Sequence, residues 1–483
     1  MIMLRPSLSL TLLISLLSLT SVHALSNNTY TYNLDFQGIT ITGCVDICPN
    51  NLILPETIDG YPVTGIGEEA FDGSPLTNIA IPSSVTHIGA YAFASGQLTS
   101  VTIPDNVTFI GGGAFSYNQL TSVTIPDSLV YLGGYAFTDN RLTTATIPDS
   151  VVFLGPYAFH DNQLTSVEIG QSVAKIYSST FEGNQLTAVT IPDSVTSIEE
   201  RAFRSNQLSV VIIGNGVTDI GDHTFSGNPL SSVTLGQSVT SIGVDAFAGG
   251  QLTQITIPDT VLKIKMAAFA NNQLTSVTLG RNLALIEGMA FYQNQLTQVT
   301  IPDSMKYIGW GAFSENNLTS VSLADSAHRI DEEAFSSNQI THITLGDSAI
   351  SIHPTAIEWN NVSTVHFSGN RPNALSPFNS NSVDTITYCS NTSGWPGEPM
   401  EGITFELRDV CESEDNNGNN HTVSASVWDI DNSGSVDALT DGLLLMRYFF
   451  GFRGNALIED AIDLNGTRTD ASEIEAHIES HML

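Results

Sequence analysis

Residues 98–119 read Leu-Thr-Ser-Val-Thr-Ile-Pro-Asp-Asn-Val-Thr-Phe-Ile-Gly-Gly-Gly-Ala-Phe-Ser-Tyr-Asn-Gln, and this 22-residue pattern decides the fold. Its apolar lead residue returns at intervals of 22 without an insertion, at Leu76, Leu98, Leu120, Leu142, Leu164, Leu186, Leu208, Leu230, Leu252, Leu274, Leu296, Leu318, Ile340 and Val362. A unit this short cannot bury its own apolar face, so neighbouring units must bury it together. The sequence therefore predicts a stacked solenoid with a long contact surface, not a globular enzyme core.

Each unit predicts one coil of the solenoid. Val101 and Ile103 alternate with hydroxyl side chains, which is the period of a half-buried strand. Pro104 has no amide hydrogen to donate to a sheet and ends that strand. The Ala-Phe pair at 114–115 predicts a short helical or 3₁₀ turn. The expected fold is an α/β solenoid with a parallel β-sheet face.

Two further rows recur at the same spacing. Phenylalanine returns at 71, 93, 115, 137, 159, 181, 203, 225, 247, 269, 291, 313 and 335, which predicts a continuous aromatic spine. Asparagine returns at 118, 140, 162, 184, 206, 228, 272, 294, 316, 338 and 360. Stacked asparagine amides can satisfy backbone groups at a sharp bend, where the sheet ladder cannot, so we expect a structural role for this row.

The pattern Leu-x-x-Val-x-Ile-Pro-x-x-Val-x-x-Ile-Gly-x-x-Ala-Phe resembles the BspA-like class of bacterial leucine-rich repeats over about residues 52–367. Ile-Asp-Gly-Tyr-Pro-Val at 58–63 is similar to the longer first repeat of that class. The resemblance implies a leucine-rich-repeat solenoid of a secreted or surface-exposed protein that binds other proteins or host and matrix surfaces.

The N-terminus predicts export. Arg5 precedes an apolar run at 8–19, and Val-His-Ala follows at 22–24, which is the pattern of a secretory signal cleaved after Ala24. An uncleaved anchor is the alternative. No later segment is apolar for long enough to span a bilayer.

Four cysteines fit an oxidising compartment. The pairs Cys44–Cys48 and Cys389–Cys411 place one disulfide at each end of the rod, whereas other pairings would join its two ends. A zinc site is the weaker alternative because the Cys-x3-Cys spacing has no matched histidine.

The net charge is −34, from 49 acidic and 15 basic residues. Nucleic acids and anionic membranes both require basic patches, so the charge argues against both partners.

Two exposed surfaces are candidates for binding. The strands predict a hydroxyl array, such as Ser100 with Thr102, which suits the wet face of a strand; a polar ligand face or an ice-matching lattice are the alternatives. A second slot holds His87, Phe109, Tyr131 and Phe153 in successive coils before changing to Lys175, with tyrosines nearby at 91, 117, 135 and 157.

Rings at one height in successive coils can stack as a ladder. We take Phe109, Tyr131, Phe153, Tyr135 and Tyr157 as candidate ligand-binding residues, against the alternative that they only stiffen the rod. A smaller aromatic cluster comprises residues 292, 307 and 310.

Residues 429–441 read Asp-Ile-Asp-Asn-Ser-Gly-Ser-Val-Asp-Ala-Leu-Thr-Asp, the pattern of a calcium loop with glycine at position 6. The expected ligands are Asp429, Asp431, Ser433, the Ser435 carbonyl and Asp437, with Asp441 one residue beyond the usual closing acid. The segment resembles a dockerin-like module, which implies calcium-dependent docking to a partner domain. A second, weaker loop would use Asp463, Asn465, Thr467 and Thr469.

No nucleophile elbow, phosphate loop or zinc-protease helix occurs, so we expect no enzyme. The leading hypothesis is a non-catalytic secreted or cell-surface binding protein with a calcium-dependent tail and a protein or glycan ligand. The alternatives are a carbohydrate-binding accessory protein and a structural or ice-interacting rod. The predicted organisation is a signal peptide (1–24), an N-terminal cap with an irregular repeat (25–75), the solenoid (76–367), a disulfide-closed cap with an acidic linker (368–420) and the calcium module (421–483).

Overall fold

The computed structural model describes residues 24–323, 329–346, 351–368, 383–389 and 404–408. The chain forms two compact units, Met1–Arg408 and Asp409–Leu483, and every described residue belongs to the first. The predicted signal peptide and calcium module therefore lie outside the described residues, apart from Ala24. Within the described ranges, no helix is long and apolar enough to cross a membrane.

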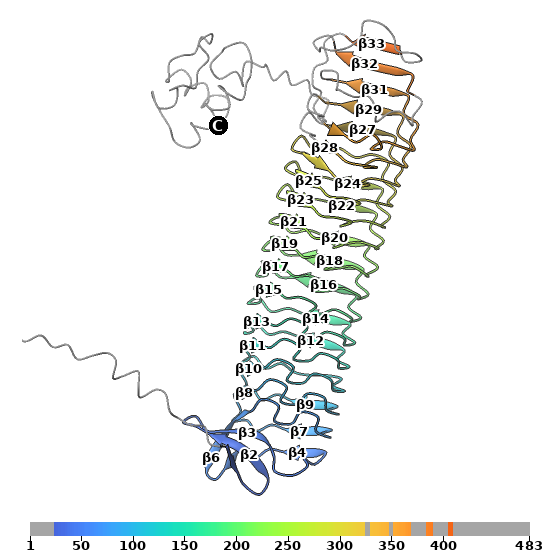
Figure 1. Ribbon diagram of the computed structural model, residues 1–483. Coiled ribbons are helices and arrows are strands. Elements are labelled where there is room, and N and C mark those ends of the chain that lie inside the picture. Colours follow the sequence, from blue (N-terminus) through green and yellow to red (C-terminus); the bar gives the residue numbers. More distant parts are fainter. Residues whose placement is uncertain (1–23, 324–328, 347–350, 369–382, 390–403, 409–483) are drawn as a thin grey trace, which may run out of the picture. The chain divides into compact units, whose positions relative to one another are not determined.

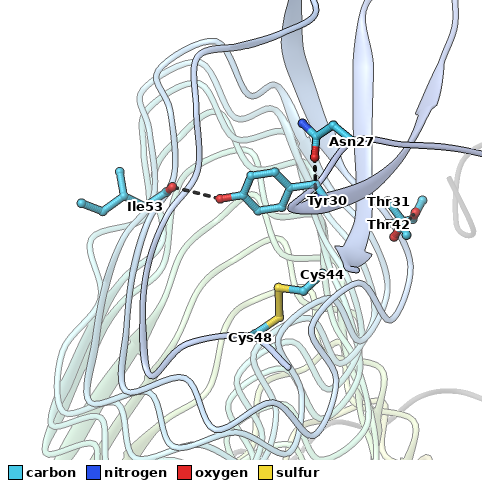
Figure 2. The surroundings of a disulfide bond; sticks show 7 residues. All are labelled: Asn27, Tyr30, Thr31, Thr42, Cys44, Cys48 and Ile53. Atoms are coloured by element: carbon cyan, nitrogen blue, oxygen red, sulfur yellow. Dashed lines mark hydrogen bonds between the residues drawn. A yellow bond between two sulfur atoms is a disulfide. The ribbon is translucent and has the colours of Figure 1, made fainter. Parts of the chain in front are cut away.

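The N-terminal cap closes the first coil with a short antiparallel sheet. β1 (Ala24–Ser26), β2 (Tyr30–Leu34) and β3 (Ile39–Cys44) pair antiparallel, and β3 runs parallel to β6 (Tyr61–Ile66), which also pairs with β5 (Thr57–Ile58). The predicted Cys44–Cys48 disulfide is confirmed and lies below this hairpin in Figure 2. The Tyr30 hydroxyl donates to the Ile53 carbonyl oxygen at 3.2 Å and so ties the hairpin to β4 (Asn51–Ile53).

Two columns of short parallel strands follow (Figure 1). The first column contains β4, β7 (Asn78–Ala80), β9 (Ser100–Thr102), β12 (Thr144–Thr146), β14 (Ser166–Glu168), β16 (Ala188–Ile191), β18 (Val210–Ile213), β20 (Ser232–Thr234), β22 (Gln254–Thr256), β24 (Ser276–Thr278), β27 (Ser320–Leu323), β29 (His342–Leu345), β31 (Thr364–Phe367), β32 (Thr385–Cys389) and β33 (Thr404–Arg408). β32 and β33 continue the parallel stack beyond residue 367.

The second column follows each strand of the first within the coil. It contains β8 (His87–Ile88), β10 (Phe109–Ile110), β11 (Tyr131–Leu132), β13 (Phe153–Leu154), β15 (Lys175–Ile176), β17 (Ser197–Ile198), β19 (Asp219–Ile220), β21 (Ser241–Ile242), β23 (Lys263–Ile264), β25 (Leu285–Ile286), β26 (Tyr307–Ile308), β28 (Arg329–Ile330) and β30 (Ser351–Ile352). Partners are 22 residues apart, as in Phe109 with Tyr131, so the predicted coil length is confirmed. The column is interrupted once, between β13 and β15.

The buried rows match the sequence prediction. The thirteen phenylalanines from Phe71 to Phe335 stack in sequence with ring centroids 5.2–5.7 Å apart. The asparagine row also acts as expected. The Asn118 side-chain oxygen accepts the Leu98 N–H at 3.0 Å, while its amide nitrogen donates to the Phe93 carbonyl oxygen at 2.7 Å. Each such side chain therefore links two coils at a bend.

No helix forms at the Ala-Phe pair among the residues that the structure describes, and the predicted helical or 3₁₀ turn is reduced to single turns, such as the bond from the Ala114 N–H to the Gly111 carbonyl oxygen at 3.3 Å. Alternate backbone N–H groups of this segment donate to the next coil, as Phe93 does to the Ala114 carbonyl oxygen at 2.8 Å, so no continuous helical run of bonds can form. Tyr91 and Ser95 have φ angles of 52° and 53°, and a left-handed residue every four positions prevents a right-handed helix. The described solenoid is consequently all-β.

Candidate functional site

The solenoid register brings the predicted aromatic slot together. Phe109, Tyr131 and Phe153 occupy the first position of β10, β11 and β13, and each is the register partner of the next. Their rings stack with centroid separations of 4.7 and 4.6 Å and interplanar angles of 10° and 5°. The ladder that the sequence predicts is thus present at the surface, where Phe109 is 39% exposed.

Stacking covers the ring faces and leaves the ring edges available. Both faces of Tyr131 are covered, by Phe109 and Phe153, and Phe153 also contacts the tilted ring of Tyr177 at 5.2 Å. A sugar that stacks on an aromatic side chain needs a free face. Tyr131, the middle ring, therefore has no free face on which a sugar could stack.

Two exposed valines that the sequence prediction missed extend this surface. Val130 and Val152 precede Tyr131 and Phe153 and are 47% and 60% exposed. The same slot holds threonine in several other coils, as at Thr196, but it also holds the exposed Leu262, so the departure from threonine was only part of a signal. We call Phe109, Val130, Tyr131, Val152 and Phe153 together the aromatic surface. Phe109, Val130 and Val152 are exposed and Tyr131 and Phe153 are half-buried, and an apolar surface of this kind is a candidate for contact with another molecule.

Tyr135 and Tyr157 form a second stacked pair, with ring centroids 4.6 Å apart. Both lie at left-handed backbone positions, with φ of 61° and 58°. A bulky residue in this conformation lowers stability by about 1 kcal/mol. Several other coils hold a small residue at the equivalent position, as at Gly311. Burial and the neighbouring tyrosines raise the pKa of Tyr135 above its ordinary value.

The ends of the aromatic slot differ in chemistry. The His87 ring lies over Gly65, where an added Cβ would be 2.0 Å from its Nε2, and burial lowers the His87 pKa. At the other end, Lys175 forms an ion pair with Glu199 at 2.6 Å and lies over the Tyr177 ring at 4.8 Å. The change from aromatic to charged side chains coincides with the interruption of the second strand column.

The smaller cluster is not a ring stack. The Tyr307 hydroxyl donates to Asp331 at 2.6 Å, and the Tyr292 hydroxyl donates to Glu315 at 2.8 Å. Trp310 is 46% exposed and its indole lies over Gly288. Within the part of the chain that the structure covers, these three rings make no stacking contact with one another.

Comparisons with known proteins agree with this architecture. The family model of BspA-type leucine-rich repeat regions matches residues 48–164, 130–253 and 240–363, which together span more than half of the chain. The chain belongs to the BspA-type leucine-rich repeat family. A comparison with curated proteins gives no match.

Two solved structures are similar to this BspA-type chain, and the first of them shows the same fold. A leucine-rich repeat protein from Bacteroides ovatus is 21% identical with a TM-score of 0.52, and the match covers 80% of this chain and 100% of that one. A leucine rich cell surface protein from Faecalibacterium prausnitzii is 25% identical with a TM-score of 0.41, with 74% and 97% covered.

The hydroxyl array is less regular than an ice-matching lattice requires. Strands such as β9 expose Ser100 and Thr102 around a buried Val101, as expected. In β18 the equivalent positions are Val210 and Ile212, which are 37% and 44% exposed. A lattice face would be broken at this coil.

The remaining predicted sites lie mostly outside the described residues. Cys389 in β32 is disulfide-bonded, whereas its predicted partner Cys411 is not among the residues described. The same holds for both calcium loops, with ligands predicted at Asp429, Asp431, Ser433, Ser435, Asp437 and Asp441, and at Asp463, Asn465, Thr467 and Thr469. These stay predictions.

Proposed function

We propose that this chain is a non-catalytic secreted or cell-surface protein that binds another protein through the aromatic surface. The observation that carries the proposal is the ladder of three stacked rings bordered by Val130 and Val152, because it presents an apolar edge where most other coils present threonine or charge. The family and the predicted signal peptide support an extracellular location. The repeats occupy the length where a catalytic domain would lie.

Charge indicates the kind of partner. Asp105, Asp127 and Asp149 are exposed and precede the three rings by four residues in their coils. With a net charge of −34 on the chain, a partner bordered by lysine or arginine would be attracted, and a strongly acidic one repelled. We therefore infer a protein ligand that presents aliphatic side chains inside a basic rim.

The C-terminal module supplies the second part of the proposal. The loop from Asp429 to Asp441 would bind calcium and order the apolar helix expected at 443–449, which would then dock on a partner domain or anchor the protein. The loop from Asp463 to Thr469 would bind a second calcium ion with a less complete ligand set.

The repeat surface is tested by truncating two of its rings and giving Val152 the threonine that several other coils carry in its slot. A full-length variant with Phe109→Ala, Tyr131→Ala and Val152→Thr should fold but lose protein binding. Extracellular proteins captured by the wild-type chain are identified by mass spectrometry, and the Kd of each purified partner is measured by surface plasmon resonance.

The matched control is Leu285→Ala with Tyr307→Ala, which changes the same slot at a distance from the aromatic surface. We expect the Kd to rise at least about tenfold in the aromatic variant, since buried aromatic anchors dominate protein interfaces, and to stay unchanged in the control. An unchanged Kd in the aromatic variant would exclude this surface as the binding site.

A further inference from the structure

Side chains of the types that bind metals lie close together four residues after each member of the tyrosine pair. One ligand atom from each of Asp139, His160 and Asp161 can be chosen so that all lie within 4.8 Å of one another. Asp139 and Asp161 are 22 residues apart, so they occupy the same position in consecutive coils. A backbone hydrogen bond also joins two members of the set, because the Asp139 N–H donates to the His160 carbonyl oxygen at 3.0 Å.

This set departs from the repeat. The His160 position holds a small residue in most coils, as in Ser116 and Thr138, which are buried. Asp139 and Asp161 have φ of 54° and 48°, and aspartate tolerates that conformation, so backbone geometry alone accounts for each aspartate. Backbone geometry does not account for the His160 imidazole beside the two aspartates. Its nitrogen donor distinguishes the set from a purely acidic cluster.

The local contacts orient the imidazole. His160 Nδ1 is 3.4 Å from Asp161, and its Nε2 faces a Glu182 oxygen at 4.0 Å. Arg204 holds Glu182 at 3.4 Å. A metal-bound histidine characteristically donates its second ring N–H to a carboxylate, which fixes the ring and strengthens the ligand. At 4.0 Å the Glu182 oxygen makes no hydrogen bond to His160 in this structure, and it is the carboxylate that faces the second ring nitrogen.

The electrostatics of the set favour a cation. One carboxylate oxygen of Asp139 and one of Asp161 lie within 4.8 Å of each other in adjacent coils. Two carboxylates that repel each other across adjacent coils would be stabilised by a positive ion between them. Asp161 is 54% exposed, which leaves room for water as a further ligand.

We propose that Asp139, His160 and Asp161 bind a divalent transition-metal ion of the zinc class and so link two consecutive coils. One imidazole nitrogen with two carboxylates is a donor set that zinc accepts, whereas calcium and magnesium take oxygen ligands. This inference is independent of the proposed partner binding. It assigns a function to residues that neither the buried rows nor the aromatic surface uses.

Isothermal titration calorimetry of the full chain with zinc chloride tests the site. The protein carries no histidine tag, and saturating calcium is present so that the predicted C-terminal loops are filled. The variants are His160→Gln and Asp139→Asn, each compared with wild type by circular dichroism without zinc. The control is His223→Gln, since His223 lies 3.5 Å from Asp245 and so keeps an imidazole with one carboxylate.

We expect one zinc site in the wild type that weakens at least about tenfold in both site variants and is unchanged in the control. Cobalt absorption bands should appear with the wild type and be lost with His160→Gln. Equal zinc affinity and stoichiometry in the wild type and His160→Gln would overturn the proposal. An equal loss in His223→Gln would also overturn it, because it would indicate general surface binding by histidines.

Discussion

Replacing Asn206 by alanine tests whether the asparagine row holds the coils together. Asn206 is 2% exposed; its side-chain oxygen accepts the Leu186 N–H at 3.0 Å. Its amide nitrogen donates to the carbonyl oxygens of Phe181 at 2.9 Å and Phe203 at 3.1 Å. Truncation removes all of these bonds from a site that water does not reach.

Losing the Asn206 side-chain oxygen costs more stability than losing its amide nitrogen. The Phe181 carbonyl oxygen keeps a bond from Asn184 at 3.1 Å after truncation, because each such carbonyl accepts from two asparagines. The Leu186 N–H has no second acceptor among its hydrogen bonds in the structure. An unsatisfied buried N–H costs about 1–3 kcal/mol, and each weakened carbonyl contact adds about 0.5 kcal/mol. We expect Asn206→Ala to lower the free energy of unfolding by about 2–4 kcal/mol.

Urea unfolding of the full chain measures this loss, with Gln207→Ala as the exposed control, for which about 0.5 kcal/mol or less is expected. Because repeat arrays can unfold locally, hydrogen exchange of the Leu186 amide provides a second readout. Protection of that amide should fall in Asn206→Ala. A change no larger than the control's, with the Leu186 amide still protected, would refute the assigned role of the row.

Three further predictions concern other parts of the chain. Phe181→Ala should lower the free energy of unfolding by about 3–5 kcal/mol in urea, since its ring is fully buried between two others; a loss below about 1 kcal/mol would contradict the spine. Burial and the bond to Asp331 raise the pKa of Tyr307 to about 12, so the stabilising contribution of Tyr307 is complete below pH 10 and is lost as pH rises through 12. Asp331→Asn should lower that pKa in an ultraviolet absorbance titration, and an unmoved pKa would count against the bond. Asp429→Ala should remove one site from a calorimetric calcium titration of the full chain, and an unchanged titration would argue against the first loop.

The sequence was sufficient for features that depend on periodicity. Once residues 22 apart are known to stack, the phenylalanine spine, the asparagine row and the ladder of Phe109, Tyr131 and Phe153 follow from position alone. The Cys44–Cys48 bond follows from proximity in the chain. These predictions hold because a solenoid places equivalent residues at equal height in every coil.

Periodicity did not predict how each limb satisfies its backbone. The segment around each Ala-Phe pair has local features of a turn, but every second N–H group there bonds to a carbonyl 21 residues away, as from Phe93 to Ala114. Local propensity carries no information about such partners. The exposure of Val130 and Val152 was likewise decided by the strand's surroundings, although their departure from threonine was visible in the sequence.

The uniformity of the buried rows gives the surface departures their meaning. The phenylalanine spine passes without a gap from Phe71 to Phe335, so every coil along it carries the same scaffold. The aromatic surface, the tyrosine pair, the histidine and aspartates at 139–161 and the interruption between β13 and β15 all fall within residues 109–176. Packing does not demand these substitutions, because neighbouring coils stack equally well without them. The proposed partner binding and zinc binding rest on residues of this stretch, so both should map to these four coils.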